Sequence, residues 1–508
     1  MFELYDHQKL MLEPMKEFEN ALLLAPCGSG KTLAAVYNWL QERPTAHMIY
    51  VLPTKTLLKS IEQDIVEILN DKDLEFKIVM LEDKEFGNSN QICIATDYGE
   101  KRETQLYAHD IILTTLDSYI SRLYRSSLTP KRYRDLPIAR ILNSTTVFDE
   151  AHMYDNYTHT LMRYVLEFLR EGNVHHIIMT ATMSEKMIEF LKLSKYPIIK
   201  VPSEEWMNFA GNKRIKEIVE YKDKNDIADK VKEIIEKNNI RKAMIVCNTV
   251  EKAQNIFKKL QKIYNNIILL HSRFKSQDRE EHEKEIFMIF EKEEAFIVAT
   301  QVIEAGLDIS FPNLITDVPA GDSLVQRIGR CARRKGENGD IFILYSDSEK
   351  TLPYSREDIE LVMKLMNGLP KIYNISFEKR LVETVTTPSM KGLAESKARG
   401  IILSTFNSLS SFGDSWISVP TRDATPVYLY FGNKIKKDIN PMDNSVRVDL
   451  RFLYSISKDL KTFTFYEKRY NEKNELEIKK SQIPFAWSIA VAKKSISYDE
   501  ILGVIKNE

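Results

Sequence analysis

A short loop near the start of the chain has the residue types that bind phosphate groups. The apolar run Ala21–Leu24 is followed by Ala25-Pro26-Cys27-Gly28-Ser29-Gly30-Lys31-Thr32 and then by a helical stretch, Leu33–Leu40. In such a loop, backbone N–H groups wrap around phosphate oxygens, the lysine reaches the β- and γ-phosphates, and the threonine hydroxyl binds Mg²⁺. Ala25 stands where the general GxxxxGK[ST] pattern has its first glycine. An ordinary strand-to-helix turn is the alternative, but the order of strand, loop and helix favours a nucleoside-triphosphate site with a catalytic Lys31.

Two carboxylates follow another apolar run. Thr145–Phe148 leads directly into Asp149-Glu150-Ala151-His152. Ligands bind beyond the carboxyl ends of parallel strands, so we expect Asp149 to hold Mg²⁺ through water. Glu150 is then the residue that orients and deprotonates an attacking water. A helix N-cap is the alternative for Asp149, and the phosphate loop upstream favours the hydrolytic interpretation.

Four arginines lie within the nine residues Gln326-Arg327-Ile328-Gly329-Arg330-Cys331-Ala332-Arg333-Arg334. If the segment is helical, Gln326, Arg330 and Arg333 share one face, because they are spaced i, i+4, i+7. We predict that these three residues are catalytic and that the two arginines stabilise charge on a transferred phosphoryl group, an effect worth ~10³–10⁵ in rate. A solvated helix face is the alternative. In the upstream segment Ala299–Ile309, Asp308 is a candidate acceptor for a ribose hydroxyl of the nucleotide.

Apolar runs alternate with amphipathic segments up to about residue 350, which is typical of βα units with a parallel sheet. Strands are predicted at 21–24, 47–52, 111–114, 145–148 and 177–180, and again at 243–247, 267–270, 296–299, 314–318 and 340–345. The alternation weakens between Tyr196 and Lys224, where we expect a joint between two lobes. The predicted domains are a nucleotide-binding lobe at 1–205, a second lobe at 206–350 and an accessory region at 351–508. In that region a helix is predicted at 355–366 with Ser355 as N-cap, and alternating apolar residues predict a half-buried strand at 446–452.

The composition limits the class of protein. The 508 residues carry 72 Lys and Arg against 73 Asp and Glu, a net charge of −1. This near-neutrality argues against a polybasic protein that binds nucleic acid by overall charge. The four cysteines form no CxxC pair, and no apolar run approaches the ~18 residues of a membrane span, so we expect a soluble cytoplasmic protein with free thiols.

One local stretch is strongly basic. Residues 122–140 contain six Lys and Arg residues against Asp135 alone, and Tyr124 and Tyr133 are interleaved among them. Basic side chains with aromatic residues between them can line a track for a single strand of nucleic acid. A solvated surface loop is the alternative.

Taken in order, these segments resemble the superfamily 2 helicases of the DExH type over about residues 1–350. The resemblance implies two tandem RecA-like parallel-sheet lobes with an accessory α+β C-terminal region, ATP and Mg²⁺ as cofactors, and an adenine-reading Gln8. It also implies nucleic-acid contacts by six residues: Thr54, Thr115, Asn248, His271, Arg273 and Thr300. Three further residues would couple hydrolysis to movement: His152, Thr180 and Thr182.

A narrower similarity is carried by Leu269-Leu270-His271-Ser272-Arg273-Phe274, by Ile303–Asp308 and by Val419-Pro420-Thr421-Arg422. These segments look like the CRISPR-associated effector helicase of type I systems. In fused members of that family an HD nuclease domain precedes the helicase, whereas here the glutamine motif begins by residue 8. We therefore expect the helicase half of a split nuclease–helicase, with an HD nuclease in trans.

The function that this resemblance implies is ATP-driven 3′-to-5′ translocation on single-stranded DNA with duplex unwinding, in CRISPR interference. Its partners would be the RNA-guided surveillance complex and the HD nuclease chain, with no membrane involved. Two alternatives stay open. One is a DExH helicase of DNA repair or RNA remodelling, and the other is an ATP-gated nucleic-acid clamp that does not unwind.

Overall fold

The structure is a computed structural model of the whole chain. It describes residues 4–506 except 27, 72–73, 75, 86–87, 89, 99–100, 103–106, 124–134, 207–208, 210, 224–225, 305–308, 348–351, 367–371, 386–425, 433–434, 436–443, 458–459, 461–462, 471–475, 482–487 and 493–495. The chain divides into two compact units. Unit 1 comprises Met1–Ala210 and Ile375–Asp423, and unit 2 comprises Gly211–Asn374 and Ala424–Glu508. Residues beyond 350, predicted as one accessory region, are thus shared between the two units.

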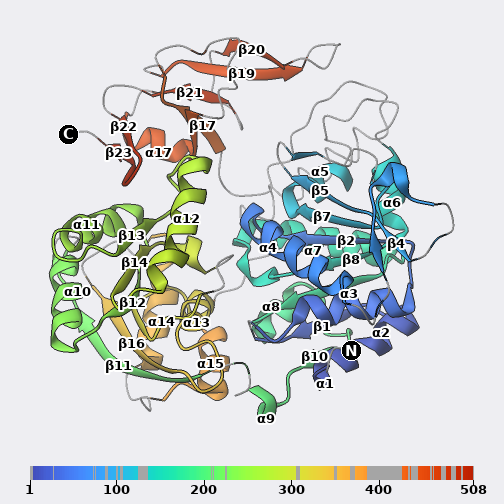
Figure 1. Cartoon of the computed structure of the whole chain (residues 1–508), viewed down its shortest axis with the longest axis horizontal. Helices are drawn as coiled ribbons and strands as arrows, with labels where there is room; N and C mark the ends of the chain where they lie inside the picture. Colours follow the sequence, from blue (N-terminus) through green and yellow to red (C-terminus); the bar gives the residue numbers. More distant parts are fainter. Residues whose placement is uncertain are drawn as a thin grey trace. The chain divides into compact units, whose positions relative to one another are not determined.

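Unit 1 is built on a sheet of eight strands (Figure 1). In spatial order these are β10 (Ile198–Lys200), β1 (Ala21–Leu24), β9 (His176–Thr180), β8 (Ser144–Phe148), β2 (His47–Leu52), β7 (Ile111–Thr115), β5 (Ile94–Tyr98) and β6 (Lys101–Arg102). All neighbours are parallel except the β5–β6 pair. The central strands β2, β7, β8 and β9 are buried along their whole length, as expected of parallel strands covered on both faces.

Helices cover the two faces of this sheet. They are α1 (Asp6–Leu10), α2 (Leu12–Glu17), α3 (Lys31–Glu42), α4 (Lys55–Leu69), α5 (Leu116–Leu123), α6 (Asp135–Leu142), α7 (Asn156–Glu171) and α8 (Glu185–Phe190). The unit also contains the helices α9 (Ser203–Trp206) and α15 (Ile375–Val382). Two 3₁₀ turns, η1 (Leu81–Asp83) and η3 (Ala151–Met153), and a small pair of strands, β3 (Lys77–Ile78) and β4 (Gln91–Ile92), complete the unit.

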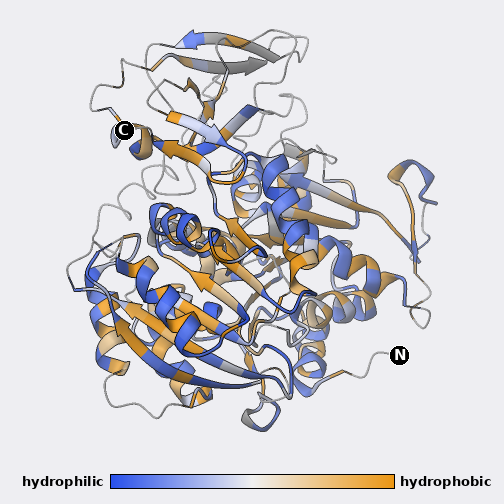
Figure 2. Ribbon diagram, turned by 60° about the vertical axis from the view of Figure 1, so that its left-hand side comes forward, coloured by the Kyte–Doolittle hydropathy of each residue, from blue (hydrophilic) through white to orange (hydrophobic). Residues whose placement is uncertain are grey.

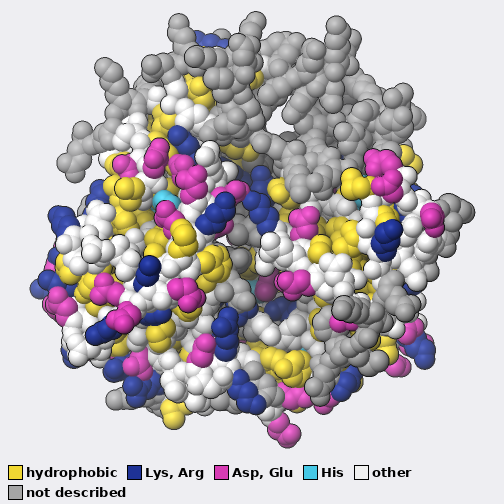
Figure 3. All heavy atoms as spheres, viewed as in Figure 1, with side chains coloured by type: hydrophobic (Ala, Val, Ile, Leu, Met, Phe, Trp, Pro, Cys, Tyr) yellow, Lys and Arg dark blue, Asp and Glu magenta, His cyan; other side chains and the backbone are white. Residues whose placement is uncertain are grey.

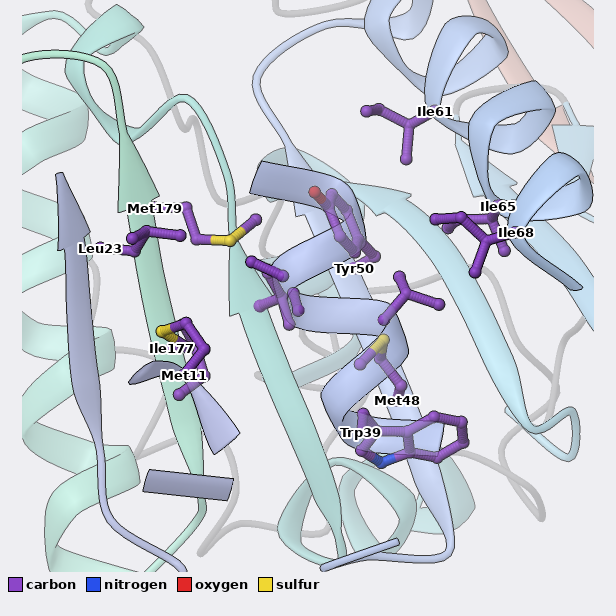
Figure 4. Close-up of a cluster of buried hydrophobic side chains, with 14 of the residues drawn as sticks. Met11, Leu23, Trp39, Met48, Tyr50, Ile61, Ile65, Ile68, Ile177 and Met179 are labelled. Carbon is purple, nitrogen blue, oxygen red and sulfur yellow. The ribbon is translucent and has the colours of Figure 1, made fainter. Parts of the chain in front are cut away.

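The period of two along each strand produces two separate cores. From β2, Met48 and Tyr50 pack with Trp39 of α3 and Ile65 of α4 on one face (Figure 4), whereas Ile49 packs on the other face among residues of α5, α7 and α8. The central strands are accordingly mostly apolar, and the helices are apolar on one side only (Figure 2). The alternation fixes the register of every strand, because a shift by one residue would exchange the two cores.

Unit 2 repeats this plan with a six-stranded parallel sheet. In spatial order its strands are β11 (Asn212–Glu220), β16 (Asn338–Tyr345), β15 (Asn313–Asp317), β12 (Lys242–Val246), β14 (Ala295–Ala299) and β13 (Ile267–Leu270). The associated helices are α10 (Asp226–Lys237), α11 (Val250–Leu260), α12 (Ser276–Phe290), α13 (Gly321–Ile328) and α14 (Arg356–Met366), with the 3₁₀ turn η4 (Gln301–Ile303).

The C-terminal part of unit 2 has a core of its own. A mixed sheet has the order β18 (Ser445–Asp449), β17 (Pro426–Tyr430), β21 (Ile489–Val491), β19 (Phe465–Tyr470) and β20 (Leu476–Ser481). The short helix α17 (Leu450–Tyr454) follows β18, and the chain closes with an antiparallel hairpin of β22 (Ile496–Asp499) and β23 (Gly503–Lys506).

These sheets confirm the predicted fold class of two RecA-like parallel-sheet lobes with an α+β C-terminal region. The ten predicted strands lie within two residues of the observed bounds, and Ser355 caps α14 by accepting from Asp358 N at 3.0 Å. The strand predicted at 446–452 was wrong in its second half. Asp449 caps α17 by accepting from Arg451 N, which turns the chain out of the sheet.

Three properties of the composition have structural counterparts. The described cysteines Cys93, Cys247 and Cys331 are buried free thiols. None of the described helices is long and apolar enough to cross a lipid bilayer. Basic and acidic side chains are interspersed over the face of the molecule shown in Figure 3.

The predicted basic track at 122–140 must be corrected at Arg122. Its guanidinium donates Nε to Asp97 Oδ2 and Nη2 to Asp97 Oδ1, both at 2.9 Å, and only 3% of the residue is exposed. Arg122 is therefore half of a buried ion pair. Arg140 contacts His47. Residues 124–134 lie outside the described residues.

Because Asp97 and Arg122 are both buried, removing one partner leaves a charge without compensation. We expect Arg122→Met to lower the free energy of unfolding of unit 1 by ~3–5 kcal/mol. The matched control is Lys192→Ala, which breaks the exposed Lys192–Glu167 pair and should cost ~0–1 kcal/mol. Denaturant unfolding followed by circular dichroism measures both changes. Equal losses for the two variants would contradict the importance of the buried pair.

Candidate functional site

The predicted phosphate loop connects β1 to α3 at the carboxyl edge of the unit 1 sheet. Gly28 and Gly30 have positive φ values of 82° and 74°, the left-handed region that glycine adopts without strain. Ser29 Oγ donates to Pro26 O at 2.8 Å, which closes the loop on itself. Lys31 begins α3, and its Nζ donates to Ala25 O at 3.3 Å. The loop therefore ends at the N-terminus of a twelve-residue helix, where anions bind favourably.

Side chains of helix α1 hydrogen-bond to backbone carbonyls of this loop. Gln8 Nε2 donates to Ser29 O and Gly30 O, both at 3.1 Å, and its Oε1 accepts from Tyr5 N at 2.9 Å. The neighbouring His7, which the sequence analysis missed, contacts Ser29 O through Nε2 at 2.9 Å. A Cβ on Gly30 would lie 2.3 Å from Gln8 Nε2, so the contact itself requires glycine at this position. In this structure the amide of Gln8 thus holds the loop, and its predicted contact with adenine stays a prediction.

The two predicted carboxylates meet the loop lysine. Asp149 and Glu150 follow β8, and Glu150 Oε1 lies 3.4 Å from Lys31 Nζ. Asp149 Oδ1 accepts from Glu150 N at 2.8 Å rather than from a helix N-terminus. Burial and the nearby negative charge of Glu150 raise the pKa of Asp149 to about 7. Two buried ionisable groups, Lys31 and Asp149, and the partly buried Glu150 therefore meet at one sheet edge, from two separate loops.

Tyr50, which the sequence analysis missed, connects the two predicted metal ligands. Its hydroxyl donates to Asp149 Oδ2 at 2.8 Å and also hydrogen-bonds the side chain of Thr32. The residue is fully buried and belongs to the apolar cluster in Figure 4. Burial and the negative charge of Asp149 hold the pKa of Tyr50 well above its ordinary value, so that the hydroxyl stays a donor. In the sequence, Tyr50 is one aromatic residue in an apolar strand, and nothing distinguishes it from a core residue.

The three predicted coupling residues lie beside Glu150. His152 Nδ1 is 3.3 Å from Glu150 Oε2 and 2.7 Å from Thr180 Oγ1. Thr180 Oγ1 in turn donates to Thr182 O at 2.8 Å. The backbone carbonyl of Thr180 also accepts a hydrogen bond from Ala25 N at 3.1 Å, which joins Thr180 to the phosphate loop. This arrangement provides a continuous path from the loop through Thr180 and His152 to Glu150.

The predicted first-lobe nucleic-acid contacts lie at the ends of neighbouring strands. Thr54 follows β2 and caps α4, and Thr115 ends β7 and accepts from Ser118 N at 3.4 Å. Leu52 and Thr115 are register partners, so both threonines lie at the carboxyl edge of the sheet. Each hydroxyl accepts a hydrogen bond from a backbone N–H at the start of the helix that follows. Both threonines lie at the same edge of the unit 1 sheet as the phosphate loop.

In unit 2, Asn248 and Thr300 likewise follow neighbouring strands, β12 and β14. Asn248 Nδ2 donates to Val318 O at 2.7 Å, and its backbone carbonyl accepts from Gln301 Nε2 at 3.1 Å. Thr300 N donates to Leu270 O at 3.2 Å. Both predicted nucleic-acid residues are buried, and their polar backbone groups are used within the lobe.

The predicted helical face of Gln326, Arg330 and Arg333 was wrong. Helix α13 ends at Ile328, and Cys331 then forms an isolated parallel bridge with Phe311, so the two arginines lie on a non-helical segment. Arg330 Nη2 donates to Glu304 O at 2.7 Å, and Arg333 N donates to Ser310 Oγ at 2.8 Å. This anchors the segment to residues 304–310 of the same unit. Gln326 remains in the last turn of α13 and is buried.

The arginine between them, Arg327, has a role that the charge count did not reveal. It is fully buried and donates Nε to Glu304 Oε1 at 2.7 Å and Nη1 to Asp317 O at 2.9 Å. Arg327 thus binds the carboxylate of Glu304, and Arg330 binds the backbone carbonyl of the same residue. Of the other predicted site residues, Cys27 and Asp308 lie outside the described residues.

His271 and Arg273, the last two predicted nucleic-acid residues, follow β13. His271 is completely buried, its Nε2 is 3.0 Å from Leu502 O, and its Nδ1 accepts from Arg273 N at 3.1 Å. Burial lowers the pKa of His271 to about 3, so the ring is neutral. The structure therefore places His271 in the packing of the loop. Arg273 is partly exposed, and its Nη1 donates to Glu251 Oε1 at 2.8 Å.

Both lobes match known protein families. Residues 5–190 match the DEAD/DEAH box helicase family, and residues 239–336 match the C-terminal region of the CRISPR-associated nuclease/helicase Cas3. The chain contains a DEAD/DEAH box helicase domain and a Cas3-like C-terminal domain. The helicase domain contains the cluster of Lys31, Asp149 and Glu150, and the Cas3-like match contains the arginines at 327–334.

Individual relatives agree with this assignment. The helicase is 29% identical over 455 residues to a CRISPR-associated nuclease/helicase Cas3 homologue of Methanocaldococcus jannaschii, covering 83% of this chain and 59% of that protein. It is 25% identical over 393 residues to the CRISPR-associated nuclease/helicase Cas3 of Methanothermobacter thermautotrophicus, covering 73% and 46%. The chain therefore spans about half the length of these relatives. In fold it is similar to T. fusca Cas3-AMPPNP, with a TM-score of 0.66, 17% identity, and coverage of 99% of this chain and 70% of that one.

The raised pKa of Asp149 predicts a pH-dependent cost in stability. An unfolded Asp149 loses its proton near 3.8, whereas the folded one keeps it to about 7. The folded state therefore binds more protons between these values, and its stability falls as the pH rises through that window. We expect Asp149→Asn to remove this cost and to raise the Tm of the nucleotide-free helicase at pH 8 by at least about 2 °C, with a smaller gain at pH 5.

The matched control is Glu171→Gln, which neutralises an exposed carboxylate of α7. Differential scanning fluorimetry between pH 5 and pH 8 measures the three proteins. A Tm difference for Asp149→Asn that does not vary with pH would contradict the assigned pKa.

Proposed function

We propose that the chain is an ATP-driven translocase and helicase that acts on single-stranded DNA and unwinds duplex in type I CRISPR interference. The observation that carries the proposal is the contact of Lys31 with Glu150 beside the buried Asp149, within a DEAD/DEAH helicase domain. The similar fold of T. fusca Cas3, solved as Cas3-AMPPNP, supports ATP as the ligand of this site.

In the proposed reaction, the phosphates of ATP bind at the phosphate loop and compete with Glu150 for Lys31. Glu150 then orients a water molecule and accepts its proton as the water attacks the γ-phosphorus, and ADP leaves. His152 contacts Glu150 and Thr180, so a change at the carboxylate is transmitted to the strand end after β9. Thr180 and Thr182 are the proposed next members of this coupling path.

A divalent cation fits the residues present. Thr32 and Asp149 share the hydroxyl of Tyr50, and the pKa of Asp149 is raised by burial and a neighbouring negative charge, both of which a cation would offset. Thr32 and Asp149 are the proposed Mg²⁺ ligands, Asp149 through water, which Mg²⁺ commonly keeps in its shell. Mg²⁺ supplies neutralisation of phosphate charge when bound.

The nucleic-acid part of the proposal rests on the strand-end residues Thr54, Thr115, Asn248 and Thr300 and on Arg273. The helicase relatives make single-stranded nucleic acid the proposed track, and the similar fold of the DUF1998 helicase MrfA bound to DNA favours DNA. We propose that Arg330 and Arg333, which are hydrogen-bonded to Glu304 and Ser310, stabilise the negative charge on the transferred phosphoryl group. Gln326 is the third residue of this proposed catalytic set. Asp308 is the proposed ribose contact.

Partners follow from the same resemblance. The relatives are nuclease/helicases, and we propose that an HD nuclease chain and the RNA-guided surveillance complex work with this helicase. Adding the purified HD chain should convert DNA unwinding into DNA degradation in a divalent-metal buffer. Degradation of DNA by the helicase alone would place the nuclease in this chain instead.

Glu150→Gln tests the assigned base. The substitution keeps the side chain's size but removes its ability to accept a proton, so we expect DNA-stimulated ATP hydrolysis to fall by about 10²–10⁴ while ATP binding remains. A phosphate-release assay and binding of a fluorescent ATP analogue measure the two properties. Glu171→Gln serves as the control with normal turnover, and normal turnover in Glu150→Gln would remove Glu150 from the mechanism.

The track is tested by comparing ATPase stimulation by single-stranded DNA and by RNA of the same sequence. Preference for DNA supports the proposal, and preference for RNA supports an RNA-remodelling helicase. Strand displacement on a 3′-tailed duplex then separates a motor from an ATP-gated clamp, which binds the duplex without displacing a strand.

A further inference from the structure

The C-terminal hairpin of β22 and β23 contacts a loop that lies more than 200 residues earlier in the sequence. This loop, residues 271–275, contains the proposed nucleic-acid contact Arg273. Val504 N donates to Arg273 O at 3.0 Å, Leu502 O lies 3.0 Å from His271 Nε2, and Lys275 N donates to the Tyr498 hydroxyl at 3.0 Å. Three residues of the 271–275 loop are thus held by three residues of the hairpin.

The fit between the two segments is tight at Gly503. This residue has a φ of +72°, and a Cβ on it would lie 2.5 Å from Arg273 O and 2.5 Å from His271 Cε1. Gly503 is therefore required both by its backbone conformation and by the space that the loop leaves. The hairpin is also anchored to α11, because Gln254 Nε2 donates to Leu502 O at 2.6 Å and to Val504 O at 3.1 Å.

The same part of the C-terminal region orients the side chain of Arg273. Its guanidinium carbon lies 4.3 Å from the ring centre of Phe452 in α17, while its Nη1 is bonded to Glu251 of α11. Lys506 of the hairpin lies 5.2 Å from the same ring, on a side chain that is exposed. Stacking fixes the plane of an arginine and leaves donors for an anionic ligand, which suits contact with a phosphate backbone.

We infer that the C-terminal hairpin is a positioning element for nucleic-acid binding, which sets the backbone of the 271–275 loop so that Arg273 grips a phosphate of the bound strand. The inference rests on the proposed function, because it assigns the ligand of Arg273. The hairpin belongs to unit 2 and the phosphate loop to unit 1, so loss of the hairpin should weaken binding to the strand and leave the hydrolytic site intact.

Gly503→Ala tests the inference, with Gly336→Ala as its matched control. Gly336 also has a positive φ, +86°, but a Cβ there would meet open space. Gly336→Ala therefore measures only the free-energy cost of a side chain at positive φ. We expect Gly503→Ala to raise the Kd for single-stranded DNA and the DNA concentration that half-maximally stimulates ATPase by about 5- to 30-fold. ATP binding, unstimulated ATPase and the maximal rate at saturating DNA should stay near wild type.

Gln254→Leu is a second variant that loosens the hairpin without adding strain, and it should shift the same two constants in the same direction. Arg273→Ala should reproduce the loss, and the double variant Gly503→Ala/Arg273→Ala should bind no more weakly than Arg273→Ala. Fluorescence anisotropy with labelled single-stranded DNA and a coupled ATPase assay provide the readouts.

The outcomes separate the two levels of the proposal. If Arg273→Ala weakens DNA binding but Gly503→Ala and Gln254→Leu do not, the positioning role of the hairpin is overturned and the helicase function stands. Additive losses in the double variant would also overturn it, since the hairpin would then act apart from Arg273. If wild-type ATPase is not stimulated by any single strand, the proposed function itself fails.

Discussion

The buried lysine of the phosphate loop imposes the main constraint on unit 1. Lys31 is only 7% exposed, and its charge is balanced by the carbonyl of Ala25 and the carboxylate of Glu150. A buried charge is stable only with such partners, and here they come from loops after different strands. The strand order β1-β9-β8-β2 is what brings those loops to one edge. Burial also raises the pKa of Asp149, so ionised Asp149 lowers the stability of the nucleotide-free protein. A bound cation and phosphates can offset this loss of stability.

Much of the fold could be predicted because parallel strands buried on both faces leave uninterrupted apolar runs in the sequence. For the same reason, the phosphate loop and the Asp149–Glu150 pair were recognisable, since each stands directly after such a run. Arg122 and Tyr50 were not recognisable. Their roles depend on Asp97 and Asp149, which lie 25 and 99 residues away and become neighbours only through the sheet. A local pattern contains no information about such pairs.

The arginine segment shows how a spacing rule fails. The positions of Gln326, Arg330 and Arg333 match a helical face, but Gly329 follows the last helical residue, and the bridge from Cys331 to Phe311 replaces the next turn. Arg327, the arginine outside the expected set, is the one that is fully buried. It binds Glu304 through the side chain while Arg330 binds the same residue through its carbonyl. The four arginines in these nine residues therefore differ in burial, from the buried Arg327 and Arg330 to the exposed Arg334, and a count of charges does not contain this difference.

Two basic residues that the sequence analysis assigned to nucleic-acid binding form ion pairs within the fold. Arg122, from the predicted basic track, pairs with Asp97, and Arg273, a predicted contact of the second lobe, pairs with Glu251. The two pairs differ in exposure. Arg122 is 3% exposed and Asp97 is equally buried, whereas Arg273 is 21% exposed and Glu251 is 47% exposed. A phosphate can displace a half-solvated carboxylate at small cost, because water replaces the lost partner, but it cannot displace a buried one. The exposed, aromatic-stacked arginine is thus the one suited to a ligand that is bound and released in every cycle, and the acidic partner keeps its affinity moderate.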